Sequence, residues 1–332
     1  MKINKNNINK KTIFLTGGTG SFGQMFVAKT LKKFNPKKII IYSRDEMKQW
    51  KMKSIYENEK RVEFFIGDVR DKDRLKMLMN NVDIVIHAAA TKIVPTAEEN
   101  PFECIKTNII GAMNVLTAAS EKNVKKIVAL STDKASSPVN LYGATKLCSD
   151  KLFVSGNFLN MNNTKACVVR YGNVMGSRGS VIPFFLSLKK NEKTPITHKD
   201  MTRFMISLDE ALKLVWFSIC DMKGGEIYVK KIPSMKVTDI AKAINSSAKF
   251  KFIGIRAGEK IHEQMIGLDD ALNTFEYGEY YKILPHSLLK KIQKSGKKVK
   301  KNFVYSSEKN EKFMTISQLK KWLNKNKKTF IN

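Results

Sequence analysis

Residues 12–23 read TIFLTGGTGSFG, an apolar run of β type followed directly by a glycine-rich loop. Gly17, Gly20 and Gly23 have the spacing G-x-x-G-x-x-G. The residues after the loop, to about Phe34, have the character of a helix. Glycine lets a backbone turn sharply and approach a pyrophosphate closely, while the helix N-terminus offers N–H groups and a positive dipole end. A strand, such a loop and a helix in this order predict a dinucleotide-binding βα unit.

Five further apolar runs alternate with helical stretches in the first half of the chain. They are KIIIYS (38–43), VEFFIGD (62–68), VDIVIHAAA (82–90), KIVALST (126–132) and ACVVRYGN (166–173). Strands that are apolar throughout are typical of sheets buried on both faces. Their alternation with helices predicts an α/β fold with a parallel, doubly wound sheet of Rossmann type.

The alternation becomes less regular after Val174, which indicates a second, smaller portion. We expect a Rossmann domain over 11–175 and a flexible tail over 1–10. Helices are expected over 207–222 and 316–323. The second half divides into segments about 205–245 that return to the sheet and an interleaved C-terminal substrate-binding portion over 176–204 and 246–332.

The composition limits the class of protein. The 332 residues contain 60 Lys+Arg and 30 Asp+Glu, a formal net charge of +30, which is compatible with a nucleic-acid binder. However, the lysines are spread along the chain, and the densest cluster, at 290–302, has almost no aromatic residues for base stacking. We therefore expect no nucleic-acid partner, and a positive field that attracts small anions.

Membrane, secretory and metal-binding features are not expected. No apolar run approaches the ~20 residues of a membrane span, and the charged first residues do not resemble a secretory signal. Cys104, Cys148, Cys167 and Cys220 lie far apart without metal-ligand spacing. This pattern favours a cytoplasmic protein with no metal and no disulfide framework.

The ends of the expected strands supply the candidate cofactor contacts. An NAD-binding site would have a carboxylate at the end of the second strand, but this chain has Ser43 and Arg44 there, then Asp45 and Lys48. A cationic fork suits a 2′-phosphate, so NADP is favoured over NAD. Asp68 and Val69 are placed to meet the adenine, and Ala88, Ala89 and Ala90 are small enough for a ring to pack against them. The other candidates are Gly17, Thr19, Gly20, Ser21, Phe22, Gly23, Lys92, Tyr142 and Lys146.

Residues 131–146, STDKASSPVNLYGATK, carry four proton-handling side chains. Tyr142 and Lys146 lie one helical turn apart, and an ammonium beside a phenol favours the phenolate. Tyr142 is therefore a candidate base. Thr132 could hold a sugar hydroxyl or the carbonyl made from it. Asp133 and Lys134 follow the carboxyl end of a strand, where doubly wound folds bind ligands, although a surface ion pair would also give this dipeptide.

Motifs in order over residues 12 to about 265 resemble those of the extended short-chain dehydrogenases/reductases. Within that superfamily the chain resembles the inverting UDP-N-acetylglucosamine 4,6-dehydratases of pseudaminic acid biosynthesis. The motifs are TGGTGSFG, YSRDE, FIGDVRD, HAAATK, NPFECIKTNIIGA, STDKA, NLYGATKLCSDKLF, RYGNVMGSRGSVIPFF, MTRF and IGIRAGEKIHE.

The resemblance implies a mechanism. Tyr142 takes the 4-hydroxyl proton while C4 hydride passes to NADP⁺, and the 4-keto group acidifies C5–H. Lys134 is then the C5 base and Asp133 the acid for the departing C6 hydroxyl. Hydride returns to C6, and C5 is reprotonated from the opposite face. Related non-inverting dehydratases carry Asp–Glu at this dipeptide.

The resemblance further implies a UDP-N-acetylglucosamine site and homo-oligomers. The implied substrate contacts are Lys92, Thr132, Asn173, Val174, Ser180, Arg203, Arg256 and Glu259. Two positions depart from the family pattern: Ile93 replaces a histidine and Ala257 replaces a proline. The alternatives are a UDP-sugar 4-epimerase, a reductase, a non-inverting dehydratase, or a non-catalytic dinucleotide-sensing or nucleic-acid-binding protein.

Overall fold

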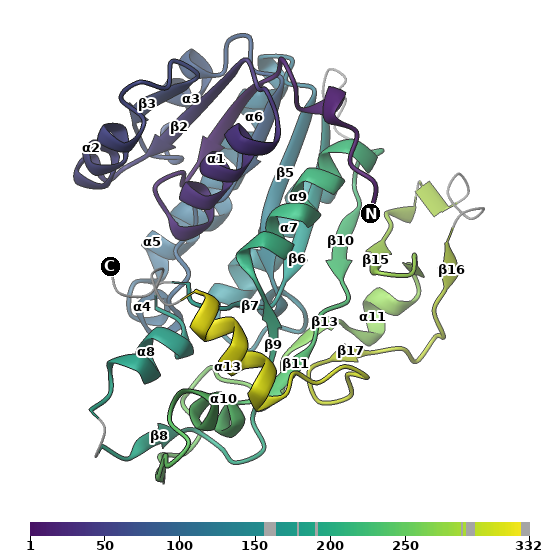
Figure 1. Ribbon diagram of the computed structural model, residues 1–332. Coiled ribbons are helices and arrows are strands. Elements are labelled where there is room, and N and C mark those ends of the chain that lie inside the picture. The colour runs from purple at the N-terminus through teal and green to yellow at the C-terminus, as the bar shows by residue number, and fades with distance from the viewer. Residues whose placement is uncertain (156–163, 178, 190–191, 287, 290–295, 327–332) are drawn as a thin grey trace.

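A ten-stranded sheet is the centre of the computed structural model, which describes residues 1–155, 164–177, 179–189, 192–286, 288–289 and 296–326 (Figure 1). Its order is β16-β14-β15-β10-β6-β5-β4-β1-β2-β3, and the strands from β10 to β3 are parallel. The order 3-2-1-4-5-6 within it is that of a doubly wound dinucleotide-binding fold. The bounds are β1 (Thr12–Thr16), β2 (Lys38–Ser43), β3 (Val62–Ile66), β4 (Ile84–His87), β5 (Lys126–Thr132), β6 (Lys165–Tyr171), β10 (Ile227–Lys230), β14 (Thr274–Glu276), β15 (Tyr280–Ile283) and β16 (Lys297–Lys298).

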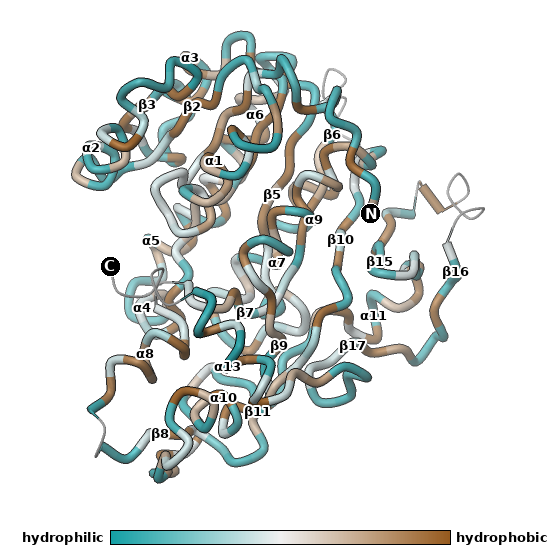
Figure 2. The backbone as a smooth tube through the Cα atoms, viewed as in Figure 1, coloured by the Kyte–Doolittle hydropathy of each residue, from teal (hydrophilic) through white to brown (hydrophobic). Residues whose placement is uncertain are grey.

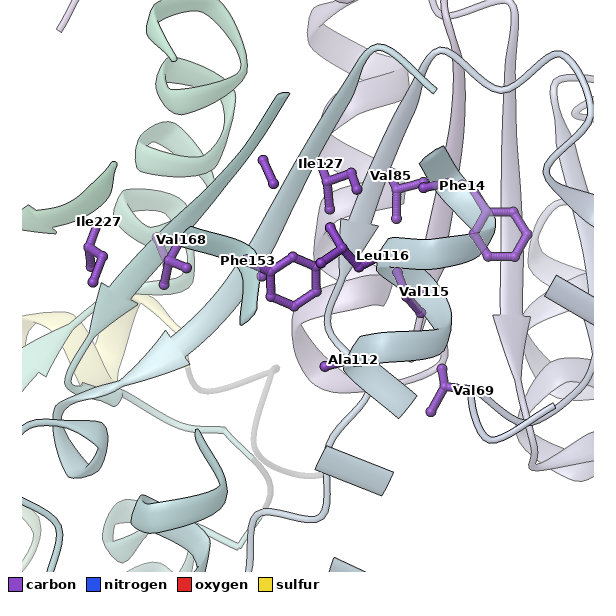
Figure 3. Packing of buried hydrophobic residues seen from close by; sticks show 14 of the residues in the cluster. Phe14, Val69, Val85, Ala112, Val115, Leu116, Ile127, Phe153, Val168 and Ile227 are labelled. Carbon is purple, nitrogen blue, oxygen red and sulfur yellow. The ribbon is translucent and has the colours of Figure 1, made fainter. Parts of the chain in front are cut away.

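Helices cover both faces of this sheet. Successive strand residues face opposite sides, so Phe14 packs in one core cluster with α3, α6 and α7, while Ile13 and Leu15 pack in another with α1 and α9. Figure 3 shows part of the first cluster, including Val115 and Leu116 of α6. The strands β5 and β6 are hydrophobic along most of their length (Figure 2), as strands covered on both faces should be. The helices are α1 (Ser21–Lys33), α2 (Glu46–Ile55), α3 (Lys72–Leu78), α6 (Gly111–Glu121), α7 (Leu141–Ser155) and α9 (Leu208–Asp221).

A smaller unit lies at the lower end of the sheet in Figure 1 and has its own core. Leu319 and Leu323 of α13 pack there in one cluster with Ile240 of α10. Three small sheets belong to the second half of the chain, with orders β11-β9-β7, β12-β8 and β13-β17. The bounds are β7 (Asn173–Val174), α8 (Val181–Ser187), β8 (Thr194–Ile196), β9 (Thr202–Ile206), β11 (Ser234–Lys236), α10 (Val237–Ile244), β12 (Phe250–Phe252), β13 (Gln264–Ile266), β17 (Tyr305–Ser306) and α13 (Ile316–Lys325).

Six short helical elements complete the fold of the described residues. They are η1 (Lys5–Asn7), α4 (Val94–Glu99), α5 (Pro101–Ile105), η2 (Lys106–Ile110), η3 (Asp133–Ala135) and α11 (Leu268–Ala271). Within the residues described, no helix combines the length and the apolar character needed to cross a membrane.

The observed boundaries differ from the expected ones in three places. Residues 1–10, expected as a flexible tail, include the η1 turn, and Ile8 is fully buried in the core. Of 205–245, only α9 and β10 return to the sheet. Conversely, β14, β15 and β16 come from the range 246–332 but extend the central sheet through antiparallel pairs. The basic stretch 290–302 falls partly outside the described residues.

Candidate active site

The glycine loop joins β1 to α1 against the end of β4. Gly17 has a φ of +66°, and a Cβ there would lie 2.8 Å from the backbone N of Ala89. A side chain at this position would therefore meet both strain and a clash. A Cβ at Gly23 would lie 2.3 Å from the Gly18 carbonyl oxygen. Gly23 thus permits the helix to pack on the loop, and it lines neither of the two cavities described below.

Helix α1 presents its N-terminus to this loop without a side-chain cap. Its N-cap residue is Gly20, which makes no capping hydrogen bond. The first N–H groups of a helix need partners from outside it. Uncapped N–H groups behind a glycine turn fit a pyrophosphate, because they supply donors and the positive end of the dipole.

The loop is braced by Thr16. Its hydroxyl accepts hydrogen bonds from the N–H groups of Ala88 (3.1 Å) and Ala89 (3.2 Å). It lies 2.9 Å from Nδ1 of His87 and can donate its proton there. Burial, and then the charge of Lys146, lower the pKa of His87 to about 3, so this imidazole is neutral. His87 therefore orients the loop rather than transferring protons near neutral pH.

A cavity of about 790 Å³ begins at the loop and runs along the carboxyl ends of the strands. Of the site residues proposed from the sequence, Gly23, Arg203 and Glu259 do not line it, and all of the others do. Arg203 and Glu259 line a second cavity of about 410 Å³. The two cavities share Lys134, Asn173, Ser180 and Arg256 in their walls, so they meet at these residues. Of the two positions that depart from the family pattern, Ile93 lines the first cavity and Ala257 the second.

The end of the cavity nearest β2 carries mixed charges. The Arg44 guanidinium lies 3.6 Å from a carboxylate oxygen of Asp68. Burial by itself would raise the pKa of Asp68, but hydrogen bonds from Arg70 and the charge of Arg44 lower it below its usual value. Asp45 caps α2 by accepting from the backbone N–H of Lys48 (2.8 Å) and pairs with the same residue's ammonium. The two cations at this rim are thus each paired with a carboxylate.

The proton-handling residues gather where β5 ends. The Thr132 hydroxyl donates to Oδ1 of Asp133 (2.9 Å), and Nζ of Lys134 donates to the same oxygen (3.2 Å). Asp133 is 1% exposed, and its Oδ2 has no hydrogen-bond partner within the described part of the chain. Tyr142 and Lys146 project from the first turns of α7 into the same cavity. The structure therefore brings all five predicted catalytic residues together.

The pKa shifts of Asp133 and Lys134 favour the protonated form of each. Burial raises the pKa of Asp133; the ammonium of Lys134 opposes this, and the charge of Glu263 adds to it. Burial by itself would lower the pKa of Lys134, but Asp133 and Glu263 outweigh it, and the pKa rises above its usual value. A lysine that acts as a base must be neutral when it acts, whereas these two carboxylates favour the ammonium form of Lys134.

Tyr142 and Lys146 shift in opposite directions. Burial raises the pKa of Tyr142 to about 12, against the lowering effects of the Lys134 ammonium and a hydrogen bond with Thr132. Burial lowers the pKa of Lys146, and Asp150 partly opposes this. The cation that counts most for Tyr142 is therefore Lys134, whereas the sequence pointed to Lys146.

Glu263 is the residue of this site that sequence reasoning missed. It precedes β13, is 2% exposed, and its Oε1 lies 2.9 Å from Nζ of Lys134. The same oxygen lies 3.7 Å from Nε of Arg203. Lys260 also lines the second cavity and donates to the Ser136 carbonyl oxygen (2.8 Å). The charged stretch GEKIHE before an apolar run was the available signal.

The fold and this site define an extended short-chain dehydrogenase/reductase, in which a glycine loop and a Tyr-x-x-x-Lys pair meet at the carboxyl edge of a doubly wound sheet. The chain belongs to the polysaccharide biosynthesis protein family, whose model matches residues 13–285.

Three similar proteins illustrate the range of relatives. The chain is 53% identical over 323 residues, 94% of its length and 96% of the relative's, to a "UDP-N-acetylglucosamine 4,6-dehydratase (inverting)" from Campylobacter jejuni subsp. jejuni serotype O:23/36 (strain 81-176). It is 43% identical over 282 residues, 82% of each chain, to a "UDP-glucose 4-epimerase" from Rickettsia canadensis (strain McKiel). The solved structure of Pen from Bacillus thuringiensis superposes with a TM-score of 0.88 at 33% identity, covering 96% of this chain and 98% of that one.

Proposed function

We propose that this protein is an enzyme that removes water across C4–C6 of UDP-N-acetylglucosamine with inversion at C5. The product would be UDP-2-acetamido-2,6-dideoxy-β-L-arabino-hex-4-ulose. The observation that carries the proposal is the position of Asp133 and Lys134. Both line the first cavity beside Tyr142, and Lys134 also lines the second. The similarity to inverting dehydratases over 94% of the chain supports the same activity.

The cofactor proposed is NADP, held by the glycine loop, with Arg44 and Lys48 at the rim for a 2′-phosphate. The uncapped N-terminus of α1 and the close approach of Gly17 to Ala89 support a dinucleotide at this end. When bound, its nicotinamide supplies the chemistry of accepting a hydride from the sugar and returning it. NAD is the second choice, because the Arg44 guanidinium already lies 3.6 Å from a carboxylate oxygen of Asp68 and is shared with it.

The protein's own residues move the protons. Tyr142 accepts the 4-hydroxyl proton; burial raises its pKa overall, and the Lys134 ammonium and a hydrogen bond with Thr132 oppose that rise and so favour the phenolate. Lys146 is buried in the second turn of α7 and would hold the cofactor ribose. Lys134 removes the C5 proton once the 4-keto group has made it acidic. Asp133 gives its proton to the C6 hydroxyl, which leaves as water; its raised pKa suits an acid.

The second cavity is proposed to hold the nucleoside diphosphate. Arg203 and Arg256 line it, and guanidinium groups pair phosphate oxygens bidentately. Phe184 and Phe185 of α8 line the same cavity and offer apolar walls to a base. Lys92, Asn173, Val174, Ser180 and Glu259 complete the proposed substrate contacts. The sugar would then lie at the junction of the two cavities, beside Lys134.

The decisive experiment is incubation with UDP-N-acetylglucosamine in deuterated water, followed by proton NMR. The proposal expects a 4-keto-6-deoxy product of L-arabino configuration with deuterium at C5. A product without inversion would indicate a non-inverting dehydratase. Unchanged substrate would contradict the proposal.

A UDP-sugar 4-epimerase is the second candidate, because relatives of 43% identity carry that name. Epimerisation needs the hydride transfer and Tyr142 but no acid–base pair for C5 and C6. The buried Asp133 and its ion-paired, half-buried neighbour Lys134 would then have no chemical task. Formation of the galacto epimer alone in the same NMR experiment would favour this candidate.

The wider setting is part of the same proposal. We place the reaction in the cytoplasm at the first step of pseudaminic acid biosynthesis, in a homo-oligomer. Size-exclusion chromatography with light scattering tests the last point, and a monomer would contradict it.

A further inference from the structure

Glu263 is held in place far more firmly than a surface carboxylate. Its backbone N–H donates to Oγ of Ser307 (2.9 Å), and the N–H of Ser307 donates to the Glu263 carbonyl oxygen (2.7 Å). The Ser307 hydroxyl in turn lies 2.7 Å from that of Thr202 in β9. Glu263 is 2% exposed and lines the second cavity. The chain thus fixes a buried carboxylate with one oxygen on the Lys134 amine.

The proposed reaction makes opposite demands on Lys134. As the base for C5 it must be a neutral amine, yet two carboxylates contact its ammonium, Asp133 at 3.2 Å and Glu263 at 2.9 Å. Lys134 must therefore pass a proton to a neighbour before it acts. In a site without water, a neutral amine–acid pair avoids the free-energy cost of two buried charges. Bound substrate displaces water from the two cavities, so it favours this transfer.

The two carboxylates differ in their ability to take that proton. Asp133 must bring its own proton to the C6 hydroxyl, and its burial favours the protonated acid. Glu263 contacts Arg203 as well as Lys134, and these cations keep it an unprotonated carboxylate in the resting site. It can therefore accept a proton, whereas a protonated Asp133 cannot. Its Oε2 is buried and has no hydrogen-bond partner among the residues described. Glu263 is the acceptor that remains.

We propose that Glu263 is the positioning residue that receives the Lys134 proton, an inference that rests on the proposed dehydration. The Nζ–H bond breaks and an Oε1–H bond forms across the 2.9 Å contact. The neutral amine then takes the C5 proton; the electron pair of that C–H bond forms the C5–C6 double bond as the C6 oxygen leaves with the Asp133 proton. After the product has left, solvent water in the second cavity, which Glu263 lines, takes this proton and restores the carboxylate.

The test compares Glu263→Gln and Glu263→Asp with the wild type in the C5 deuterium assay. Glutamine keeps an oxygen for the lysine N–H but cannot accept a proton, so kcat should fall by about 100-fold or more with KM changed little. Aspartate should recover part of the rate.

The pH profile separates proton transfer from mere packing. The charged groups that act on Glu263 are Lys134, Arg203, Lys260 and Asp133. Glu263 helps to raise the pKa of Lys134, so removing its charge lowers that pKa. In Glu263→Gln, kcat should therefore rise with increasing pH as Lys134 loses its proton to solvent, while the wild-type kcat changes little over the same range.

Matched controls keep the outcomes distinct. Glu276→Gln removes another lysine–glutamate pair, with Lys231, that lines neither cavity, and it should retain wild-type kcat. The inference is overturned if Glu263→Gln keeps kcat within about threefold of wild type, or if all Glu263 variants lose activity equally at every pH. If thermal unfolding shows that Glu263→Gln is misfolded, the comparison of Glu263→Asp with the wild type decides. If the wild type makes no dehydrated product, the proposed function fails instead.

Discussion

Replacing Lys134 by methionine removes a charge while keeping most of the apolar stem, so it tests the centre of the site directly. The ammonium sits between the carboxylates of Asp133 and Glu263, which are 1% and 2% exposed. Breaking a buried pair by deleting one partner costs 3–5 kcal/mol, and Arg203 still lies 3.7 Å from Glu263. We therefore expect a loss near the lower end, about 3 kcal/mol, and for a chain of 332 residues a fall in Tm of roughly 4 °C.

The stability loss of Lys134→Met should depend on pH with a definite sign. In the wild type, burial alone would raise the pKa of Glu263, but Lys134 lowers it overall, so the carboxylate stabilises the fold above its unfolded pKa. Without Lys134, burial raises the pKa of Glu263, and the penalty fades as pH falls and the group is protonated. The difference in Tm between variant and wild type should be full at about pH 8 and smaller at about pH 5.

Activity and cofactor binding complete this test. Dehydration should fall by about 10²–10⁴-fold because no base removes the C5 proton, while NADP binding, followed by fluorescence, should persist because the glycine loop is untouched. Deuterium incorporation at the wild-type rate, or a Tm difference that grows as pH falls, would refute the reasoning.

Three further changes probe the rest of the site. Tyr142→Phe should lower kcat by about 10²–10⁴-fold in the NMR assay because the base is gone; retained turnover would remove Tyr142 from the chemistry. Arg44→Ala should weaken NADP by about 10-fold or more, and NAD far less, because a charge-assisted contact to the 2′-phosphate is lost; equal effects in titrations of both would contradict the cofactor proposal. Gly17→Ala should abolish cofactor binding in calorimetry, because its φ is +66° and the new Cβ would lie 2.8 Å from Ala89 N; unchanged affinity would show that the loop relaxes at little cost.

The sequence predicted the doubly wound half of the fold closely, because its information is local. The runs at 38–43 and 126–132 became β2 and β5 without a change of boundary. Continuous apolar character is a strong signal of strands buried on both faces. By contrast, β14 and β15 are short and antiparallel, and β16 pairs with β14 through Lys297 and Lys298. Strands this short have no periodic pattern from which they could be predicted.

The site residues also divide into those that a local sequence motif predicts and those that it does not. Tyr142, Lys146 and the glycine loop carry short motifs, and the structure brings them into one cavity. The contact of Lys134 with Glu263 joins segments from opposite halves of the chain, and only the folded arrangement reveals it. The direction of the Lys134 pKa shift depends on that contact, so it could not be read from the dipeptide Asp133–Lys134.

The segments that carry Lys134 and Glu263 share one core. Met265 and Ile266, which follow Glu263 in β13, belong to the same cluster of buried residues as Phe14 of the large sheet. Arg170 of β6 also donates to the Met265 carbonyl oxygen (2.8 Å). A movement of the smaller unit, which packs around its own core, therefore need not separate the amine from the carboxylate, and the base would keep its proton acceptor while nucleotide sugars enter and leave.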